Sequence, residues 1–200
     1  LTNLGHNCRD MKKHEKATDH YRLALDMRKR MHGHDSDNQD IALGLIYLGN
    51  NYNGMMEYEK AVEHYRLALD MYKRIHGEDS DCSEIAQAHN SCAANFNDME
   101  EFSEAEEQYR PSLDTHEGIH EEDSDHQMMA VLCNKLGNNY SSMKKHAEAE
   151  EHYRLSLDMY KRIHGEDSEN CNIARVLSHL GKVYSNMEEY KKAEEHYRLS

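Results

Sequence analysis

The sequence has little of what strand-rich or membrane-spanning proteins need. It contains one proline and ten glycines in 200 residues, and such a scarcity of turn residues argues against folds built from many short strands. No apolar run approaches the roughly 20 residues that cross a bilayer, and the first 20 residues lack the apolar core of a signal peptide. Helix-favouring residue types are plentiful, so the composition predicts an all-α protein without membrane insertion.

Basic residues are also in short supply. The chain has 24 Lys and Arg against 38 Asp and Glu, a formal net charge of −14. Nucleic acids and anionic membranes bind basic surfaces, so this balance argues against both as partners. The five cysteines are odd in number and show no paired spacing, which is typical of reduced thiols and predicts a cytoplasmic protein.

A repeat of 44 residues organises the whole chain. Tyrosines recur at this interval, at Tyr21, Tyr65, Tyr109, Tyr153 and Tyr197. Self-similarity at a fixed period predicts a solenoid. We therefore predict one solenoid domain over residues 1–200, a fragment of a longer protein, with truncated units at both ends. The five units span approximately 1–37, 38–81, 82–125, 126–169 and 170–200.

Each unit is predicted to contain two helices. In the second unit, apolar residues at helical spacing predict helix A from about Asn38 to Met55 and helix B from about Tyr58 to Ile75. A small residue such as Gly49 lets the two backbones approach closely. Three cysteines stand where other units carry Tyr or Leu, so we expect them to be small buried hydrophobic residues. They are Cys8, Cys92 and Cys133.

The helix ends carry their own signals. Ser36 with Gln39, and Ser124 with Gln127, fit capping boxes that open helix A. Gly77 follows helix B, where a glycine can adopt the left-handed conformation that ends a helix.

The third unit differs from the others. It carries Pro111 inside helix B where the other units have Leu. Proline removes one helical hydrogen bond and crowds the preceding turn, so we predict that this helix is kinked or broken near Pro111.

The motif L-G-x-x-Y at Leu48, Gly49 and Tyr52, followed by Ala61 and Tyr65, matches the tetratricopeptide signature. It returns in the fourth and fifth units. A period of 44 lies in the range of HEAT and armadillo repeats, but the extra ten residues fit a longer helix B and the linker "HGEDSD". The chain thus resembles the long-repeat tetratricopeptide class of kinesin light chains and nephrocystin-like proteins. The resemblance implies a right-handed superhelical solenoid of antiparallel helix pairs.

One segment matches a catalytic motif. Residues 116–120 read His-Glu-Gly-Ile-His, the H-E-x-x-H pattern of zinc proteases. However, His120 is the histidine that recurs at the end of helix B, and His116 is a single change from the recurring tyrosine. A neighbouring glycine weakens the helix that would hold the ligands. We therefore predict no catalytic residues, no metal and no cofactor.

The resemblance also implies that the A helices line a concave ligand face. The positions assigned to that face are rich in Asn and Ser, and an Asn amide can donate to and accept from a peptide backbone. We expect them to bind a neutral to mildly acidic protein or peptide segment. The candidate residues are Asn50, Asn53, Asn90, Asn97, Asn134, Asn138, Ser141, Arg175 and Lys182.

Two alternatives stay open at this point. Asn and Ser on these helices could merely solvate a helix face. The repeats could also form a structural, self-associating or sensor arm of a larger signalling protein whose enzymatic domain lies elsewhere. The sequence leaves the oligomeric state open.

Overall fold

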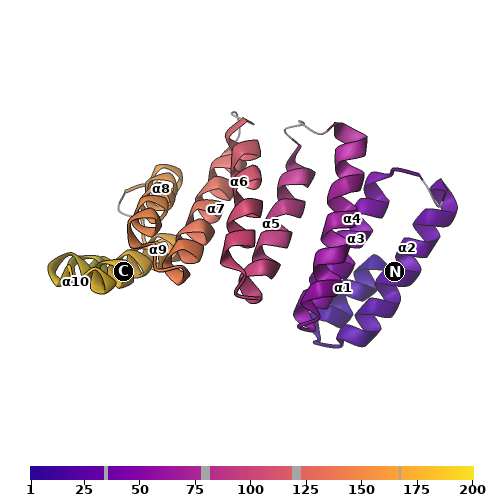
Figure 1. Cartoon of the computed structure of the whole chain (residues 1–200), viewed down its shortest axis with the longest axis horizontal. Coiled ribbons are helices and arrows are strands. Elements are labelled where there is room, and N and C mark those ends of the chain that lie inside the picture. The colour runs from indigo at the N-terminus through magenta and orange to yellow at the C-terminus, as the bar shows by residue number, and fades with distance from the viewer. Residues whose placement is uncertain (34–35, 78–81, 119–122, 167) are drawn as a thin grey trace. The chain divides into compact units, whose positions relative to one another are not determined.

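A computed structural model describes residues 1–33, 36–77, 82–118, 123–166 and 168–200, with the backbone alone at 116–118 and 123–125. The described residues form ten α-helices and no strand, which confirms the all-α prediction (Figure 1). The helices are α1 (Thr2–Asp10), α2 (His14–His32), α3 (Gln39–Gly54), α4 (Tyr58–His76), α5 (Ser83–Asp98), α6 (Phe102–Gly118), α7 (Asp123–Ser142), α8 (His146–His164), α9 (Cys171–Asn186) and α10 (Tyr190–Leu199). In these ranges no helix is both long and apolar enough to cross a membrane.

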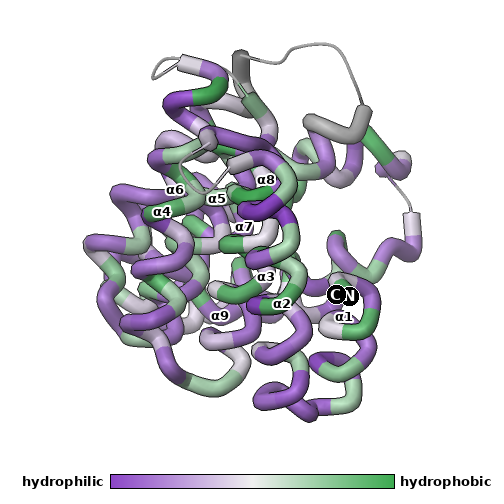
Figure 2. Tube along the Cα trace, turned by 90° about the vertical axis from the view of Figure 1, so that its right-hand side faces the viewer, coloured by the Kyte–Doolittle hydropathy of each residue, from purple (hydrophilic) through white to green (hydrophobic). Residues whose placement is uncertain are grey.

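The chain forms two compact units, each containing several of the 44-residue repeats. The first unit is Leu1–Gln108 and the second unit is Tyr109–Ser200, and α6 contributes to both. In the first unit α1 packs on α2, α2 on α3, α3 on α4 and α4 on α5. In the second unit α7 packs on α8, α8 on α9 and α9 on α10. Consecutive helices therefore form the antiparallel pairs expected of the repeat. Hydrophobic and hydrophilic positions alternate along each helix (Figure 2), as helices with one buried face require.

The close approach of helices A and B depends on a glycine. A Cβ atom at Gly49 would lie 2.6 Å from Cε1 of Tyr65, and one at Gly137 would lie 2.6 Å from Cε1 of Tyr153. Both tyrosines are buried. The glycine of the L-G-x-x-Y motif is thus explained by the ring that packs on it, since protein interiors are close-packed.

The helix ends differ in part from the prediction. The Asn38 side chain caps α3 by accepting a hydrogen bond from the backbone N–H of Asp40 at 2.8 Å. The predicted cap at Ser36 is therefore wrong, because Asn38 is adjacent to the helix and Ser36 is not. Ser124 lies inside α7, which begins at Asp123, so it is not a cap either. Gly77 does end α4 with a positive φ of 99°.

Helix α6 runs through Pro111 as one segment, so the predicted break is wrong, and a kink near Pro111 stays a prediction. Buried residues on both sides of the proline explain why the helix persists. Tyr109 and Ser112 are almost inaccessible, and Thr115, also buried, donates its hydroxyl to the carbonyl of Pro111 at 2.9 Å. Packing of these side chains offsets the lost backbone hydrogen bond.

All five cysteines are free. Cys92 and Cys133 are buried, which confirms the prediction for these two positions. Burial raises the pKa of Cys92 to about 11, so its thiol stays protonated at neutral pH. Cys8 is only half-buried, because it lies on the first helix.

Candidate functional site

The first helix of each repeat, helix A, is an odd-numbered helix of the structure. Successive A helices contact one another within each unit. In the first unit α3 contacts α5, and in the second unit α7 contacts α9. The predicted Asn53 joins the first pair: its amide nitrogen donates to Oδ1 of Asn95 at 2.9 Å and to Oδ2 of Asp98 at 2.8 Å. Asn53, which the sequence assigns to the ligand face, therefore uses its side-chain amide to hold α5 against α3.

A tyrosine of helix B orients the asparagine at the centre of this face. The Tyr65 hydroxyl donates to Oδ1 of Asn50 at 2.8 Å, and the Tyr153 hydroxyl donates to Oδ1 of Asn138 at 2.7 Å. Each amide nitrogen then has no partner among the described residues. Burial raises the pKa of both tyrosines, so the hydroxyls remain protonated donors.

This orientation fixes what the two asparagines can do. Because the amide oxygen already accepts a hydrogen bond, each side chain offers an N–H donor and little acceptor capacity. Asn50 is half-buried and Asn138 is exposed. They are suited to bind a carbonyl or carboxylate oxygen rather than both edges of a peptide bond.

Asn134 lies deeper than the sequence indicates. It is 7% exposed, and its Oδ1 lies 3.0 Å from Nδ1 of His179. The residue therefore links α7 to α9 and positions the His179 ring. In the first unit, Asn90 and Asn97 are both half-buried on α5.

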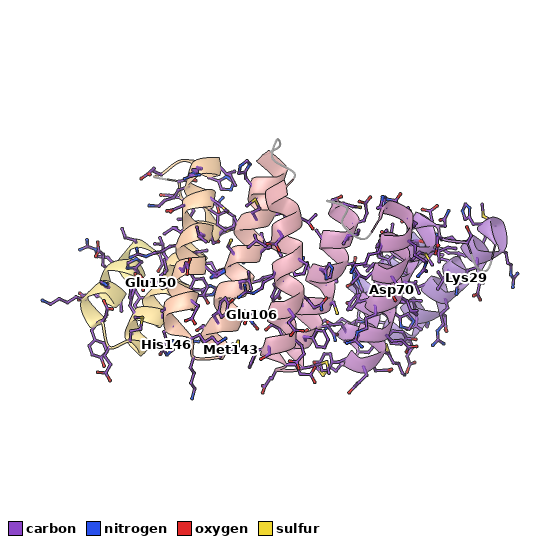
Figure 3. All side chains as sticks on the ribbon, turned by 45° about the horizontal axis from the view of Figure 1, so that its top comes forward. Lys29, Asp70, Glu106, Met143, His146 and Glu150 are labelled. Atoms are coloured by element: carbon purple, nitrogen blue, oxygen red, sulfur yellow. The ribbon has the colours of Figure 1, made fainter. Side chains whose placement is uncertain are left out.

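The second unit concentrates positive charge on its A-helix face. Lys182 is exposed and lines a cavity of about 420 Å³ with Ser141, Ser142, Lys144, His146 and Asn186. The cavity lies beside the turn between α7 and α8, where Met143 and His146 are found (Figure 3).

Helix α9 carries a further positive charge besides Lys182. Arg175 is exposed and donates to Oδ1 of Asn172 at 2.6 Å. Burial, followed by the charges of Arg175 and Lys182, lowers the pKa of His179. His179 is therefore neutral at pH 7, and the two cations dominate this part of the surface.

A second group of asparagines, which the sequence prediction missed, holds the repeats together. Asn51 is fully buried and donates to the carbonyl of His14 at 2.9 Å and to the Thr18 hydroxyl at 2.8 Å. Asn95, 44 residues later and equally buried, donates to the carbonyl of Tyr58 at 3.1 Å. The recurrence of Asn at this buried register position was the available signal.

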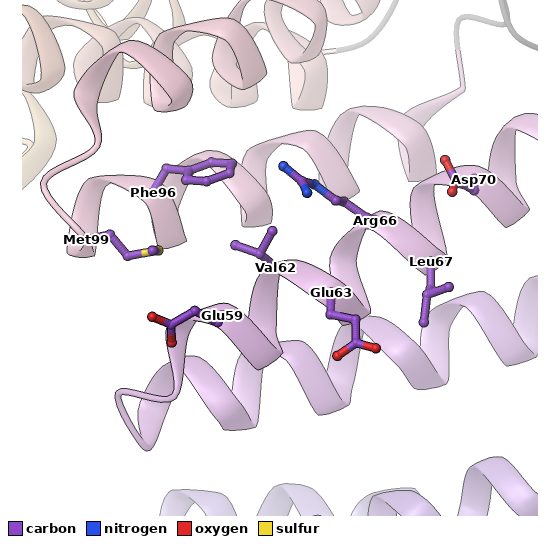
Figure 4. A pocket seen from close by; sticks show the side chains of 8 residues that line it. All are labelled: Glu59, Val62, Glu63, Arg66, Leu67, Asp70, Phe96 and Met99. Carbon is purple, nitrogen blue, oxygen red and sulfur yellow. The ribbon is translucent and has the colours of Figure 1, made fainter.

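The structure also shows a cavity on the helix B side that the sequence did not predict. It has a volume of about 410 Å³ and lies between α4 and α5 (Figure 4). Its lining residues are Glu59, Val62, Glu63, Arg66, Leu67, Asp70, Phe96 and Met99.

A missing hydroxyl sets this junction apart. At three other junctions an arginine of helix B donates to a tyrosine of the next repeat: Arg22 to Tyr52 at 2.6 Å, Arg110 to Tyr140 at 3.1 Å and Arg154 to Tyr184 at 2.9 Å. Here the corresponding residue is Phe96, so Arg66 has no such acceptor.

The H-E-x-x-H segment, residues 116–120, extends into the part of the chain that the structure does not describe. The side chains of His116 and His120 lie outside the described residues.

Comparison with known proteins agrees with the repeat pattern. Tetratricopeptide repeat models match residues 1–38, 40–118 and 127–200. No curated relative matches the sequence.

Solved structures share the fold across almost the whole chain. BtubC (BKLC) from P. vanneervenii is 23% identical with a TM-score of 0.83, covering 98% of this chain and 76% of its own. A kinesin light chain-type protein of Podospora anserina with nearly identical TPR-like repeats is 12% identical, again with a TM-score of 0.83, covering 99% and 90%. A Rap protein complexed with competence and sporulation factor is 18% identical with a TM-score of 0.71, covering 98% of this chain and 50% of its own.

Proposed function

Since the chain belongs to the tetratricopeptide repeat family, we propose that it is an interaction scaffold whose A helices hold a peptide segment of a partner protein. The observation that carries the proposal is the pair Asn50 and Asn138, each fixed by a tyrosine hydroxyl with its amide nitrogen unpartnered among the described residues. An oriented donor needs no rearrangement when a ligand binds, so less free energy is lost on association.

The charge of the A-helix face indicates the character of the peptide. Lys182 and Lys144 line a polar cavity in the second unit, and Arg175 is exposed on α9, the helix that also carries Lys182. Acidic side chains of a peptide would be attracted there, while carbonyl groups elsewhere along the peptide accept from the asparagine amides. We therefore propose a neutral to mildly acidic segment.

The net charge of −14 does not oppose such a ligand at physiological salt. The Debye length is about 8 Å at an ionic strength of 0.15 M, so distant acidic residues on the helix B side are largely screened. Lys182 and Arg175 act over a shorter distance and therefore govern the local attraction.

The experiment begins with a pull-down of partners on the 200-residue chain, identified by mass spectrometry. Hydrogen exchange is then compared with and without a synthetic peptide of the bound segment. We expect the peptide to slow exchange in α3, α5, α7 and α9. Slower exchange confined to α4 and α10 would contradict the proposal and place the partner on the helix B side. Self-association without a peptide would appear as a concentration-dependent molar mass.

A further inference from the structure

Three different metal-binding side chains meet at the junction of α4 and α5. His76 is the last residue of α4, Cys82 immediately precedes α5, and Glu84 lies in its first turn. One ligand atom of each, a ring nitrogen, the Sγ atom and a carboxylate oxygen, lies within 4.8 Å of the other two. From this geometry we infer that His76, Cys82 and Glu84 form a binding site for a zinc ion that links the two helices.

The distances are close to those that zinc requires. Zinc binds cysteine sulfur at about 2.3 Å, and histidine nitrogen and carboxylate oxygen at about 2.0–2.2 Å, in tetrahedral geometry. Ligand atoms in such a site are roughly 3.4–3.6 Å apart. Cys82 Sγ and Glu84 Oε2 are already 2.9 Å apart, and His76 is exposed at its helix end, so rotation of its side chain can close the site. The fourth position is left for water.

The surroundings prepare the carboxylate to be a ligand. The Cys82 thiol and the Ser83 hydroxyl both donate to Oε2 of Glu84, and Gln39 of α3 donates to Oε1 at 2.5 Å. Ser83 and Gln39 are not ligands themselves, and hydrogen bonds from such residues orient the ligands of metals in proteins. On binding, the Cys82 thiol loses its proton to solvent, and the thiolate and carboxylate together neutralise the charge of Zn²⁺.

Cys82 lacks the helix-capping role that the residue at the same register position has at two other junctions. At its position the α2–α3 and α8–α9 junctions carry Asn38 and Asn170, and each caps its helix by accepting a backbone N–H. Cys82 makes no side-chain cap bond. Glu84 likewise stands where the α8–α9 junction has Asn172. The three ligand types therefore coincide at one of these three junctions, in a spacing that matches no familiar zinc motif.

The test is a metal titration of the full 200-residue chain after removal of metals with a chelator. Cobalt(II) is added first, because a thiolate ligand gives a charge-transfer absorption band, and Zn²⁺ is then added to displace it. We expect one equivalent of each ion per chain. Glu84→Gln replaces a ligand and is expected to weaken binding by more than the roughly 10–100-fold that is typical of losing a residue that only hydrogen-bonds to a ligand.

Cys82→Asn is the decisive variant, because it installs the capping residue of the sibling junctions and so keeps the helix start intact. We expect it to abolish the cobalt band and the rise in melting temperature that zinc produces. Cys171→Ser and His116→Tyr are the controls: the first removes the exposed thiol at the start of α9, and the second removes the H-E-x-x-H match. Both should bind as the parent does. Absence of stoichiometric binding, persistence of the band in Cys82→Asn, or its loss in either control would overturn the proposal.

Discussion

Replacement of Asn51 by valine tests how the repeats are joined. Valine occupies the same register position in the last repeat, where Val183 is fully buried. The structure contrasts the two situations directly. His14 Nδ1 lies 3.1 Å from Oδ1 of Asn51, whereas the equivalent nitrogen of His146, opposite Val183, is buried without a partner among the described residues.

The magnitude follows from the bonds that are lost. Asn51 makes two donated bonds and one contact with the His14 ring, and each neutral bond is worth about 0.5–1.5 kcal/mol net. Burial of the valine side chain returns about 1.5 kcal/mol, the lower end of the range for an aliphatic residue. We therefore expect Asn51→Val to lower the free energy of unfolding by about 1–3 kcal/mol.

Chemical denaturation measures this loss, and hydrogen exchange locates it. Because repeats depend mainly on their neighbours, exchange should accelerate most in α1 and α2. A double-mutant cycle with His14→Phe supplies the control, since the two changes share one interaction and should not be additive. A loss below about 0.5 kcal/mol, or strict additivity in the cycle, would refute the reasoning.

Three further predictions concern the third repeat and its junctions. Pro111→Leu restores the residue of the sibling repeats, and relief of a helix-interior proline, which costs about 3 kcal/mol, should raise the melting temperature; an unchanged value would show that the site has adapted to proline. Phe96→Tyr should raise the unfolding free energy by about 0.5–1.5 kcal/mol by giving Arg66 an acceptor, and the gain should vanish when Arg66 is alanine. Burial lowers the pKa of His89, so the unfolded chain binds more protons below pH 6.5 and stability falls as the pH drops from there towards the folded pKa. His89→Leu should reduce that slope in denaturation curves at several pH values, and an identical slope would mean that His89 is not protected from protonation.

The fold could be predicted from the sequence because its determinants repeat. The 44-residue interval, the helical spacing of apolar residues and the glycine opposite each tyrosine all report local packing, and Gly49 against Tyr65 shows the result. The break at Pro111 was mispredicted because helix propensity was considered without the buried neighbours that hold α6 together.

The site could be predicted only in outline, since adjacent asparagines have opposite roles. Asn50 lies on the A-helix face, whereas Asn51 is buried between repeats, and a residue type alone does not separate them. The meeting of His76, Cys82 and Glu84 depends on how α4 and α5 pack, and sequence spacing does not contain that information.

The most direct test of the proposed A-helix face is a binding titration with the identified partner peptide. Asn138→Ala should weaken binding by about 0.5–1.5 kcal/mol through loss of one neutral hydrogen bond. Lys182→Glu should slow association and reduce its salt dependence. Lys191→Glu, the same charge reversal at an exposed position of α10, and Lys161→Ala on α8 should change binding little. If the helix B variants weaken binding most while Asn138→Ala and Lys182→Glu bind as the parent does, the peptide does not lie on the A helices.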